Sequence, residues 1–391
     1  MNILFDLFTP QHFTGGAGEY IRRVFYSLLE TIEDSQLDVS VVGLLDSSLG
    51  RYAYSDLAPE ALKAKGVSVA DIAGTNLKNI IATYSIDRVF IGAAQYWGAR
   101  FDVENITCPV VCVIHDLCDE EVNSTCLKTM ENDGNMWQTA RGRLSKIAHS
   151  LLRHKMGIDR MKPVVGMIRK NPNVDVVTIS QFSLRSIEYH LGLKSSQTHV
   201  LYSPERISPP LENPHDIHVR ELIESGRKYY LMLTANRWLK NAERAINAFN
   251  KYVELTGGEE YFVTLGYPVS TSEHHIVMPY LHASDLSQLM MHCHALVFPS
   301  FFEGFGYPPV EAMKYGKPVL ASNVTSIPEV LGDAAVYFSP FYESDIYKAF
   351  CSLRSDNYEY YSQKARERYD IVSARQADDL KKLIKLILCQ E

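Results

Sequence analysis

The sequence has no stretch of 18 or more apolar residues, the length that a membrane-spanning helix requires. Its start, Met1–Phe8, is apolar only over the length of one strand and lacks the basic residues and cleavage site of a secretion signal. Basic residues are outnumbered, since 39 Lys and Arg face 46 Asp and Glu. The formal net charge of −7 gives no general attraction to nucleic acid, so we expect no nucleic-acid partner.

Cysteine is sparse and irregularly spaced. The seven cysteines include no C-x-x-C pair, which argues against a zinc site. Reduced thiols fit this pattern best, and they predict a cytoplasmic location. Four cysteines lie between positions 108 and 126, where we expect small core and loop residues.

At 391 residues the chain is too long for one ordinary core, so two domains are expected. Short apolar runs alternate with helical patterns in both halves, as is typical of parallel strands buried on both faces. The predicted strands are Asn2–Phe8, Asp38–Leu45, Arg88–Ile91, Pro109–Ile114, Val174–Ile179, Thr198–Tyr202, Tyr229–Ala235, Tyr261–Leu265, Ala295–Phe298, Pro318–Ala321 and Ala335–Phe338. The predicted helices include Gly18–Ile32, Gln181–Leu191, Lys240–Leu255, Ser284–Cys293, Pro309–Tyr315 and Glu343–Leu353. We expect Ser284 to cap its helix, and Gly257 and Gly316 to end theirs.

The segment Ser203–His218 separates the two halves. It holds four prolines, which can neither continue a helix nor sit in a central strand. We therefore predict an α/β fold of two doubly wound, Rossmann-like domains, with the boundary between residues 205 and 206. Such domains leave a cleft at the carboxyl ends of their strands, and ligands bind there.

The stretch from Ala295 to Pro340 is the richest in chemistry. Glu303 lies just past a predicted strand end, between apolar residues and two glycines, Gly304 and Gly306, that let the backbone approach a ligand. Pro308 and Pro309 then start a helix, and Glu311 is expected in its first turn. Free N–H groups at such a junction can bind hydroxyls or an anion. Taken singly, each glutamate could also be a solvated acid or balance the helix dipole.

This stretch resembles the donor-binding signature of the family 4 retaining glycosyltransferases, the glycosyl transferases group 1, which have the two-domain GT-B fold. The resemblance is close over about Tyr229–Pro340 and loose over the first half. The matching parts are Phe298–Ser300, Glu303–Gly306, Glu311–Met313, Gly316–Val319 and Pro328–Val330. It implies that Glu303 faces the donor sugar near its reacting carbon, and that Glu311 accepts hydrogen bonds from the ribose. It also implies that the backbone N–H groups of Phe305 and Gly306 bind sugar hydroxyls, and that a C-terminal helix within 372–391 packs back on the first domain.

Two cations, Arg237 and Lys240, follow a strand end and open a helix. A leaving nucleoside diphosphate gains negative charge, and cations placed there stabilise the transition state more than the ground state. The resembled family has an Arg and a Lys at this spacing for that purpose. Without Glu303 and Glu311, the same residues would read equally well as a solvated basic turn.

Two features of the first half are placed near the substrates by the same resemblance. The turn Gly15–Gly18, with Gly15 and Gly16 at its start, would approach the diphosphate and the acceptor, although a plain flexible turn has the same pattern. His115, followed by Asp116, ends a strand and could donate to a sugar hydroxyl, or form a structural pair. In the second half, Gly266 and Pro279 are expected near the base.

Some positions depart from the family pattern. The usual glycine-rich start of the second domain is here Thr234–Asn236, and the usual exit from the first domain is Tyr202–Pro204. These departures leave the preference for base and sugar open. No Asp-x-Asp motif occurs, a motif that holds a divalent metal in transferases of the other large fold. We therefore predict no metal and no other cofactor.

The stretch Arg141–Lys170 holds nine Lys or Arg against one acid, Asp159, with leucines and isoleucine at helical spacing. We favour an ordinary amphipathic helix that covers the first sheet. Contact with an anionic membrane surface that carries a lipid-linked acceptor is the alternative.

The leading hypothesis is a retaining hexosyltransferase that uses a nucleotide sugar, with GDP-mannose as first choice and UDP-hexoses next. Its acceptor would be a glycan or glycolipid in the synthesis of a bacterial surface polysaccharide. A nucleotide-sugar 2-epimerase of the same fold and a non-catalytic nucleotide-sugar-binding subunit are the alternatives.

Overall fold

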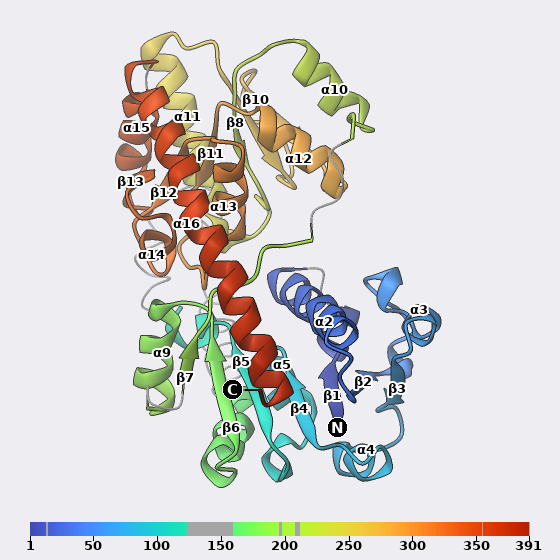
Figure 1. The fold of residues 1–391 in the computed structure, drawn as a ribbon. Coiled ribbons are helices and arrows are strands. Elements are labelled where there is room, and N and C mark those ends of the chain that lie inside the picture. Colours follow the sequence, from blue (N-terminus) through green and yellow to red (C-terminus); the bar gives the residue numbers. More distant parts are fainter. Residues whose placement is uncertain (13–14, 123–158, 195–197, 208–211, 354, 391) are drawn as a thin grey trace, which may run out of the picture. The chain divides into compact units, whose positions relative to one another are not determined.

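The computed structural model describes residues 1–391 except 13–14, 123–158, 195–197, 208–211, 354 and 391. The chain divides into two compact units, one reaching residue 207 and including residues 375–391, the other spanning Ser208–Ala374 (Figure 1). These limits differ by two or three residues from the predicted boundaries at 205 and 371. Among the described residues, no helix is both long and apolar enough to cross a membrane.

The first unit is built on a seven-stranded sheet with the order β3-β2-β1-β4-β5-β6-β7, in which every pairing is parallel. Its strands are β1 Asn2–Asp6, β2 Ser40–Leu45, β3 Ser68–Asp71, β4 Arg88–Ile91, β5 Val110–Ile114, β6 Val174–Thr178 and β7 Thr198–Val200. The predicted strand over 2–8 ends two residues early, at Asp6. The edge strand β3 was not predicted, because only one of its four residues is buried and no apolar run marks it.

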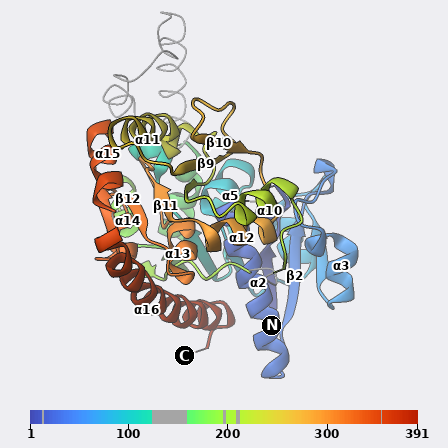
Figure 2. The same cartoon turned by 90° about the horizontal axis from the view of Figure 1, so that it is seen from above.

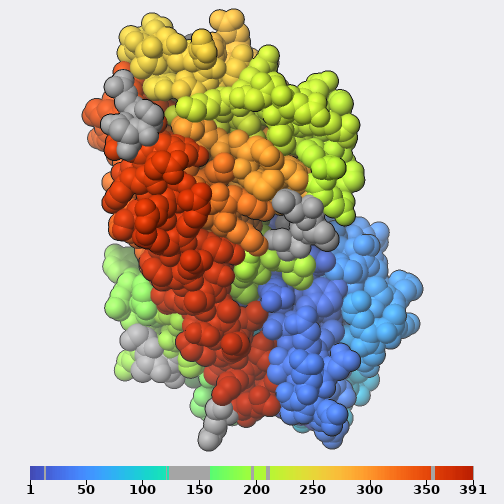
Figure 3. Space-filling view, turned by 45° about the horizontal axis from the view of Figure 1, so that its top comes forward, coloured from blue at the N-terminus to red at the C-terminus, as the bar shows by residue number. Residues whose placement is uncertain are grey.

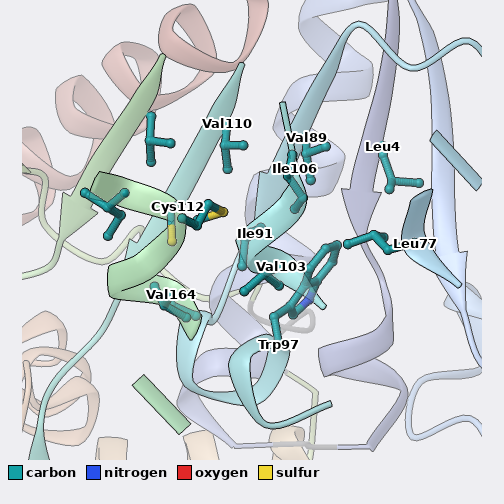
Figure 4. Packing of buried hydrophobic residues seen from close by; sticks show 14 of the residues in the cluster. Leu4, Leu77, Val89, Ile91, Trp97, Val103, Ile106, Val110, Cys112 and Val164 are labelled. Carbon is teal, nitrogen blue, oxygen red and sulfur yellow. The ribbon is translucent and has the colours of Figure 1, made fainter. Parts of the chain in front are cut away.

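Helices complete the first unit on both sides of its sheet. They are α1 Phe8–His12, α2 Gly16–Asp34, α3 Pro59–Ala64, α4 Leu77–Thr83, α5 Ala94–Arg100, α6 Cys118–Glu121 and α9 Gln181–Leu191, with a further helix over 159–170. One part of the core gathers around Trp97 of α5, whose ring is fully buried among aliphatic side chains such as Leu77 and Val103 (Figure 4). The apolar strand residues thus find helices on both faces, as continuous apolar runs require.

The second unit repeats this plan with the strand order β10-β9-β8-β11-β12-β13, again entirely parallel. Its strands are β8 Tyr229–Met232, β9 Tyr261–Leu265, β10 His275–Met278, β11 Ala295–Phe298, β12 Val319–Ser322 and β13 Ala335–Phe338. The predictions for β9, β11 and β13 are confirmed at both ends. The edge strand β10 was missed, since it is short and begins with a histidine.

The helices of the second unit are α10 Ile217–Glu224, α11 Ala242–Thr256, α12 Ala283–His292, α13 Tyr307–Lys314, α14 Ile327–Leu331 and α15 Glu343–Ser352 (Figure 2). Gly257 ends α11 in the left-handed conformation, as predicted. The prediction that Ser284 caps α12 is wrong, because the helix begins at Ala283 with His282 before it. Proline at the first turn of α13 is confirmed.

The last helix, α16 Ser355–Leu388, begins well before the C-terminal helix expected within 372–391. Its early turns contact the second unit, where Ser362 donates to the Gly316 carbonyl at 2.8 Å. From Arg375 onward it belongs to the first unit, where the Arg375 guanidinium lies 3.5 Å from the Tyr202 ring centroid. There Asp379 accepts the Tyr202 N–H at 3.0 Å. In the space-filling view one side of α16, drawn in red, faces outward (Figure 3). A helix with one exposed face carries polar and charged residues along it, so no continuous apolar run marks it in the sequence.

Candidate active site

The strand order of the second unit reverses direction between β8 and β11. In an open parallel α/β sheet, ligands bind at the carboxyl ends of the strands at such a point. The loop after β8 carries Arg237 and Lys240, and the loop after β11 carries Glu303. The topology therefore brings together residues that are more than 60 positions apart in the sequence.

Lys240 and Glu303 form an ion pair at the centre of this edge. The Lys240 Nζ lies 2.5 Å from Glu303 Oε1, and the two side chains are 15% and 14% exposed. The ammonium also lies 5.3 Å from the ring centroid of Phe298, the last residue of β11. Two residues expected to contact different parts of one donor are thus direct neighbours.

The backbone of Glu303 is held from a third loop. Its N–H donates to Thr325 Oγ1 at 3.2 Å, and its carbonyl accepts from Ser326 Oγ at 2.9 Å. Both partners lie between β12 and α14, and Thr325 has a φ of +55°, an uncommon conformation for a β-branched residue. The carboxylate therefore stands on a backbone that is fixed on both sides.

Arg237 does not join the Lys240–Glu303 pair. It precedes the short 3₁₀ helix Trp238–Lys240, and its side chain is exposed. Within the described part of the chain its guanidinium has no ion pair or side-chain hydrogen bond. The two predicted cations thus share a loop, but only Lys240 is drawn into the contact with the carboxylate.

The junction between β11 and α13 differs from its prediction in one respect. Gly306 takes a φ of +98°, a conformation that suits glycine, and α13 begins directly after it. Because the helix begins at Tyr307, Glu311 lies in the second turn, and the first turn carries no acid. Dipole compensation at the helix start therefore does not explain Glu311, whose side chain is half-buried. Phe305 is buried at this junction.

A second group gathers at the carboxyl ends of β8, β9 and β10. Gly266 follows β9 with a φ of +81°, and a Cβ placed there would lie 3.0 Å from the Tyr280 ring. The Tyr280 hydroxyl donates to Asn236 Oδ1 at 2.5 Å, while its ring stays 60% exposed. Pro279 is also exposed. Gly266 and Pro279, the positions expected near the base, thus lie beside an exposed aromatic ring, that of Tyr280.

In the first unit the strand order reverses between β1 and β4. At this point the peptide of Gly92, just after β4, is held from both sides. Its N–H donates to Asp6 Oδ2 at 3.1 Å, and its carbonyl accepts from His115 Nε2 at 2.8 Å. A Cβ on Gly92 would lie 2.3 Å from Ile21 Cγ1, so only glycine lets α2 pack this closely.

His115 is buried at the end of β5, and burial lowers its pKa to about 4, so the ring is neutral near pH 7. A carbonyl oxygen can only accept, so Nε2 carries the proton and Nδ1 is left as an acceptor. In the structure Nε2 of His115 donates to the Gly92 carbonyl, and donation from His115 to a sugar hydroxyl stays a prediction. Its own carbonyl accepts from Ser183 Oγ at 2.9 Å, which makes His115 part of the scaffold of this loop cluster.

Asp6 is a buried residue of this cluster that the sequence analysis missed. Its carboxylate accepts from the N–H and the Oγ1 of Thr9, each at 2.9 Å, in addition to the Gly92 N–H. Burial nevertheless raises its pKa to about 6. The signal was available, because Asp6 is the first acid after an apolar run, but the predicted strand ran past it to Phe8.

Gly16 is the first residue of α2, and Gly15 precedes it as the N-cap. The short helix α1 lies between β1 and these glycines in the sequence, and this helix was not predicted. A Cβ built on Gly15 meets no atom of the described residues within 4 Å. The approach of Gly15 and Gly16 to the diphosphate and the acceptor stays a prediction.

Most of the predicted basic stretch, residues 141–158, lies outside the described residues. The part over 159–170 is a helix, and Met161, Val164 and Met167 on it are buried in the core of the first unit. This part behaves as an amphipathic helix that covers the sheet. Among the described residues, no cluster of three or more His, Cys, Asp or Glu has the geometry of a metal site.

Comparison with known proteins finds a family model that matches within the second unit. Residues 215–368 match the family described as glycosyl transferases group 1. Among curated proteins, the chain is 34% identical over 150 residues to the serotype-specific mannosyltransferase WbdA of Escherichia coli, covering 38% of this chain and 18% of WbdA. It is 51% identical over 61 residues to the O-antigen chain mannosyltransferase B of the same species, covering 16% of each chain. The chain thus spans less than a fifth of the length of these relatives.

Solved structures match over nearly the whole length. WaaG, a glycosyltransferase involved in lipopolysaccharide biosynthesis, has a TM-score of 0.60 at 15% identity, with 98% of this chain and 99% of WaaG covered. Anabaena Alr3699/HepE in complex with UDP and glucose has a TM-score of 0.62 at 14% identity, with 99% of each chain covered. The chain therefore has the GT-B fold of two parallel-sheet α/β domains, and its residues 215–368 are similar to the glycosyl transferases group 1.

Proposed function

We propose that this chain is a glycosyltransferase that moves a hexose from a nucleoside-diphosphate sugar to a glycan or lipid-linked acceptor. The observation that carries the proposal is the pairing of Lys240 and Glu303 at the point where the second sheet reverses its strand order. A cation and a carboxylate at one ligand-binding edge suit a substrate that carries a diphosphate and a reacting sugar carbon side by side. The family match over 215–368 supports the same assignment.

The proposed chemistry follows from charge. As the bond between sugar and diphosphate lengthens, the leaving phosphate gains negative charge and the sugar carbon gains positive charge. Lys240 would stabilise the phosphate, and Glu303, held by Thr325 and Ser326, would face the sugar. Because the ammonium and the carboxylate already neutralise each other, a donor phosphate would partly replace Glu303 as the partner of Lys240. Arg237, exposed in the same loop, would add a second cation.

We propose GDP-mannose as the donor and mannose as the transferred sugar, since the relatives WbdA and mannosyltransferase B are named as mannosyltransferases. Their names also support an acceptor in a bacterial surface polysaccharide. UDP-hexoses are the competing donors, because HepE was solved with UDP and glucose. Glu311 would hold the ribose, Gly266, Pro279 and Tyr280 would lie at the base, and transfer would retain the anomeric configuration without a metal. The transfer reaction would take place in the cytoplasm, at the inner face of the membrane.

Product analysis tests the proposal. The protein is incubated with GDP-mannose or a UDP-hexose and a short oligosaccharide acceptor, and the products are identified by mass spectrometry. A longer glycan with an α-linked hexose, identified by nuclear magnetic resonance, is the expected result. An epimerised nucleotide sugar would instead show a 2-epimerase of the same fold, and an unchanged mixture with all donors would indicate a binding subunit.

A further inference from the structure

Asn241 directly follows Lys240 and occupies an unusual position. It precedes α11 with φ and ψ of +58° and +38°, in the left-handed region that few residues other than glycine adopt. Asparagine tolerates this conformation better than most side chains. Yet the residue is only 5% exposed, so its side chain is buried at the same edge of the sheet as Lys240 and Glu303.

The buried amide of Asn241 uses all of its polar atoms. Nδ2 donates to the carbonyl of Pro299 at 3.1 Å and to the carbonyl of Pro340 at 2.9 Å. Oδ1 accepts from Arg244 Nη1 at 3.2 Å. The two carbonyls follow different strands, β11 and β13, which are separated in the sheet by β12. One amide therefore joins the loops after β8, β11 and β13.

Asparagine alone combines these properties. Glycine would accept the backbone but has no side chain, and aspartate has the right shape but cannot donate to two carbonyls at neutral pH. One backbone bond, from Phe301 N–H to the Leu239 carbonyl at 2.9 Å, also joins the first two loops. Loss of the amide should therefore loosen the loops without separating them.

We propose that Asn241 is a positioning residue that sets the geometry between Lys240 and Glu303. Asn241 lies in the same loop as Lys240, and Pro299 begins the loop that carries Glu303, so the amide links the backbones of both partners. Because Nδ2 also donates to the Pro340 carbonyl, the loop after β13 holds the amide in place as well. The inference rests on the proposed function, since its value for catalysis depends on Lys240 and Glu303 acting on a donor.

The first test is Asn241→Gly, which keeps the left-handed backbone and removes all three hydrogen bonds. We expect a folded protein whose kcat falls at least tenfold, with the donor KM changed less than threefold, because the transition state depends more on placement than donor binding does. Asn241→Asp should lose more, since it places a carboxylate against two carbonyls. The matched control is Gln36→Gly, an exposed residue at φ +49°, which should keep wild-type kinetics.

A second measurement separates positioning from general loosening. In a Lys240→Ala background, Asn241→Gly should lower kcat less than threefold further, because its route to the substrate is already gone. In urea unfolding, the coupling between Lys240→Ala and Glu303→Gln is the difference between the midpoint shift of the double variant and the sum of the two single shifts. This coupling should shrink by at least half when the same cycle is measured in the Asn241→Gly protein. Full additivity in kcat together with an unchanged midpoint coupling would overturn the inference.

The two failures are distinguishable. If the wild type transfers sugar and Asn241→Gly does so equally fast, the positioning role is wrong and the proposed function stands. If the wild type transfers no sugar, the proposed function fails, and the midpoint coupling alone decides whether Asn241 sets the Lys240–Glu303 geometry.

Discussion

Replacing Lys240 by alanine should cost both activity and stability, a result that the sequence alone did not suggest. From the sequence, Lys240 follows a strand end, where truncation removes charge but little packing. In the structure it is 85% covered and lies 2.5 Å from a carboxylate that is equally covered. The variant therefore leaves Glu303 without its partner in a site from which water is largely excluded.

The magnitude follows from this burial. Removing one partner of a fully buried pair costs about 3–5 kcal/mol, whereas an exposed pair contributes about 0.2–1 kcal/mol. With both side chains about 15% exposed, Lys240→Ala should lower the free energy of unfolding by about 2–3 kcal/mol. The double variant Lys240→Ala/Glu303→Gln should be less destabilised than the sum of its parts by about 1–2 kcal/mol, because no charge is left unpaired.

Urea unfolding followed by circular dichroism measures this cycle, with fits that allow two transitions because the chain has two units. The control is Lys251→Ala on α11, whose pair with Glu254 at 3.0 Å is more than half exposed on both sides. It should change stability by less than about 0.5 kcal/mol. A coupling between Lys240 and Glu303 no larger than that of this control would refute the assignment of a buried pair. In activity, Lys240→Ala should cost about 2–4 kcal/mol of transition-state stabilisation.

Three further predictions address the substrate, the metal and the pH dependence. Glu311→Gln should mainly raise the donor KM, since ribose contacts change little during reaction, and Glu303→Gln should mainly lower kcat; the reverse pattern in steady-state kinetics would exchange their roles. Turnover should persist in excess EDTA, and activity that only magnesium or manganese restores would disprove a metal-free reaction. Burial lowers the pKa of His115 from 6.5 to about 4, so its contribution to stability is lost as the pH falls through this window. Burial raises the pKa of Asp6 from 3.8 to about 6, so its contribution is lost as the pH rises through that range. On going from pH 7 to pH 5, His115→Gln should therefore gain about 2 kcal/mol of unfolding free energy relative to wild type, and Asp6→Asn should lose about 1 kcal/mol. Urea titrations at both pH values measure these changes. If the unfolding free energy changed equally with pH in all three proteins, the burial of these groups would be contradicted.

The strands were predictable where local chemistry is unambiguous. Parallel strands buried on both faces must be apolar along their length, so β9, β11 and β13 are read directly from their runs. The edge strand β3 has only one buried residue, so no apolar run marks it, and the edge strand β10 was missed because it is only four residues long and begins with a histidine. Only the second half of α16 was expected, and its first half, which belongs to the other unit, was missed.

The site divides along the same line. Residue types and short-range order determined that Glu303, Arg237 and Lys240 lie in loops that follow strand ends, but they placed Glu311 one helical turn too early. They could not determine that Lys240 and Glu303 pair, since 63 residues separate them and only the order of β8 and β11 in the sheet makes them neighbours. The same holds for Asn241, whose amide reaches carbonyls 58 and 99 residues away. Local sequence specifies which group ends a strand, whereas contact between strand ends depends on the long-range pairing that only the folded sheet decides.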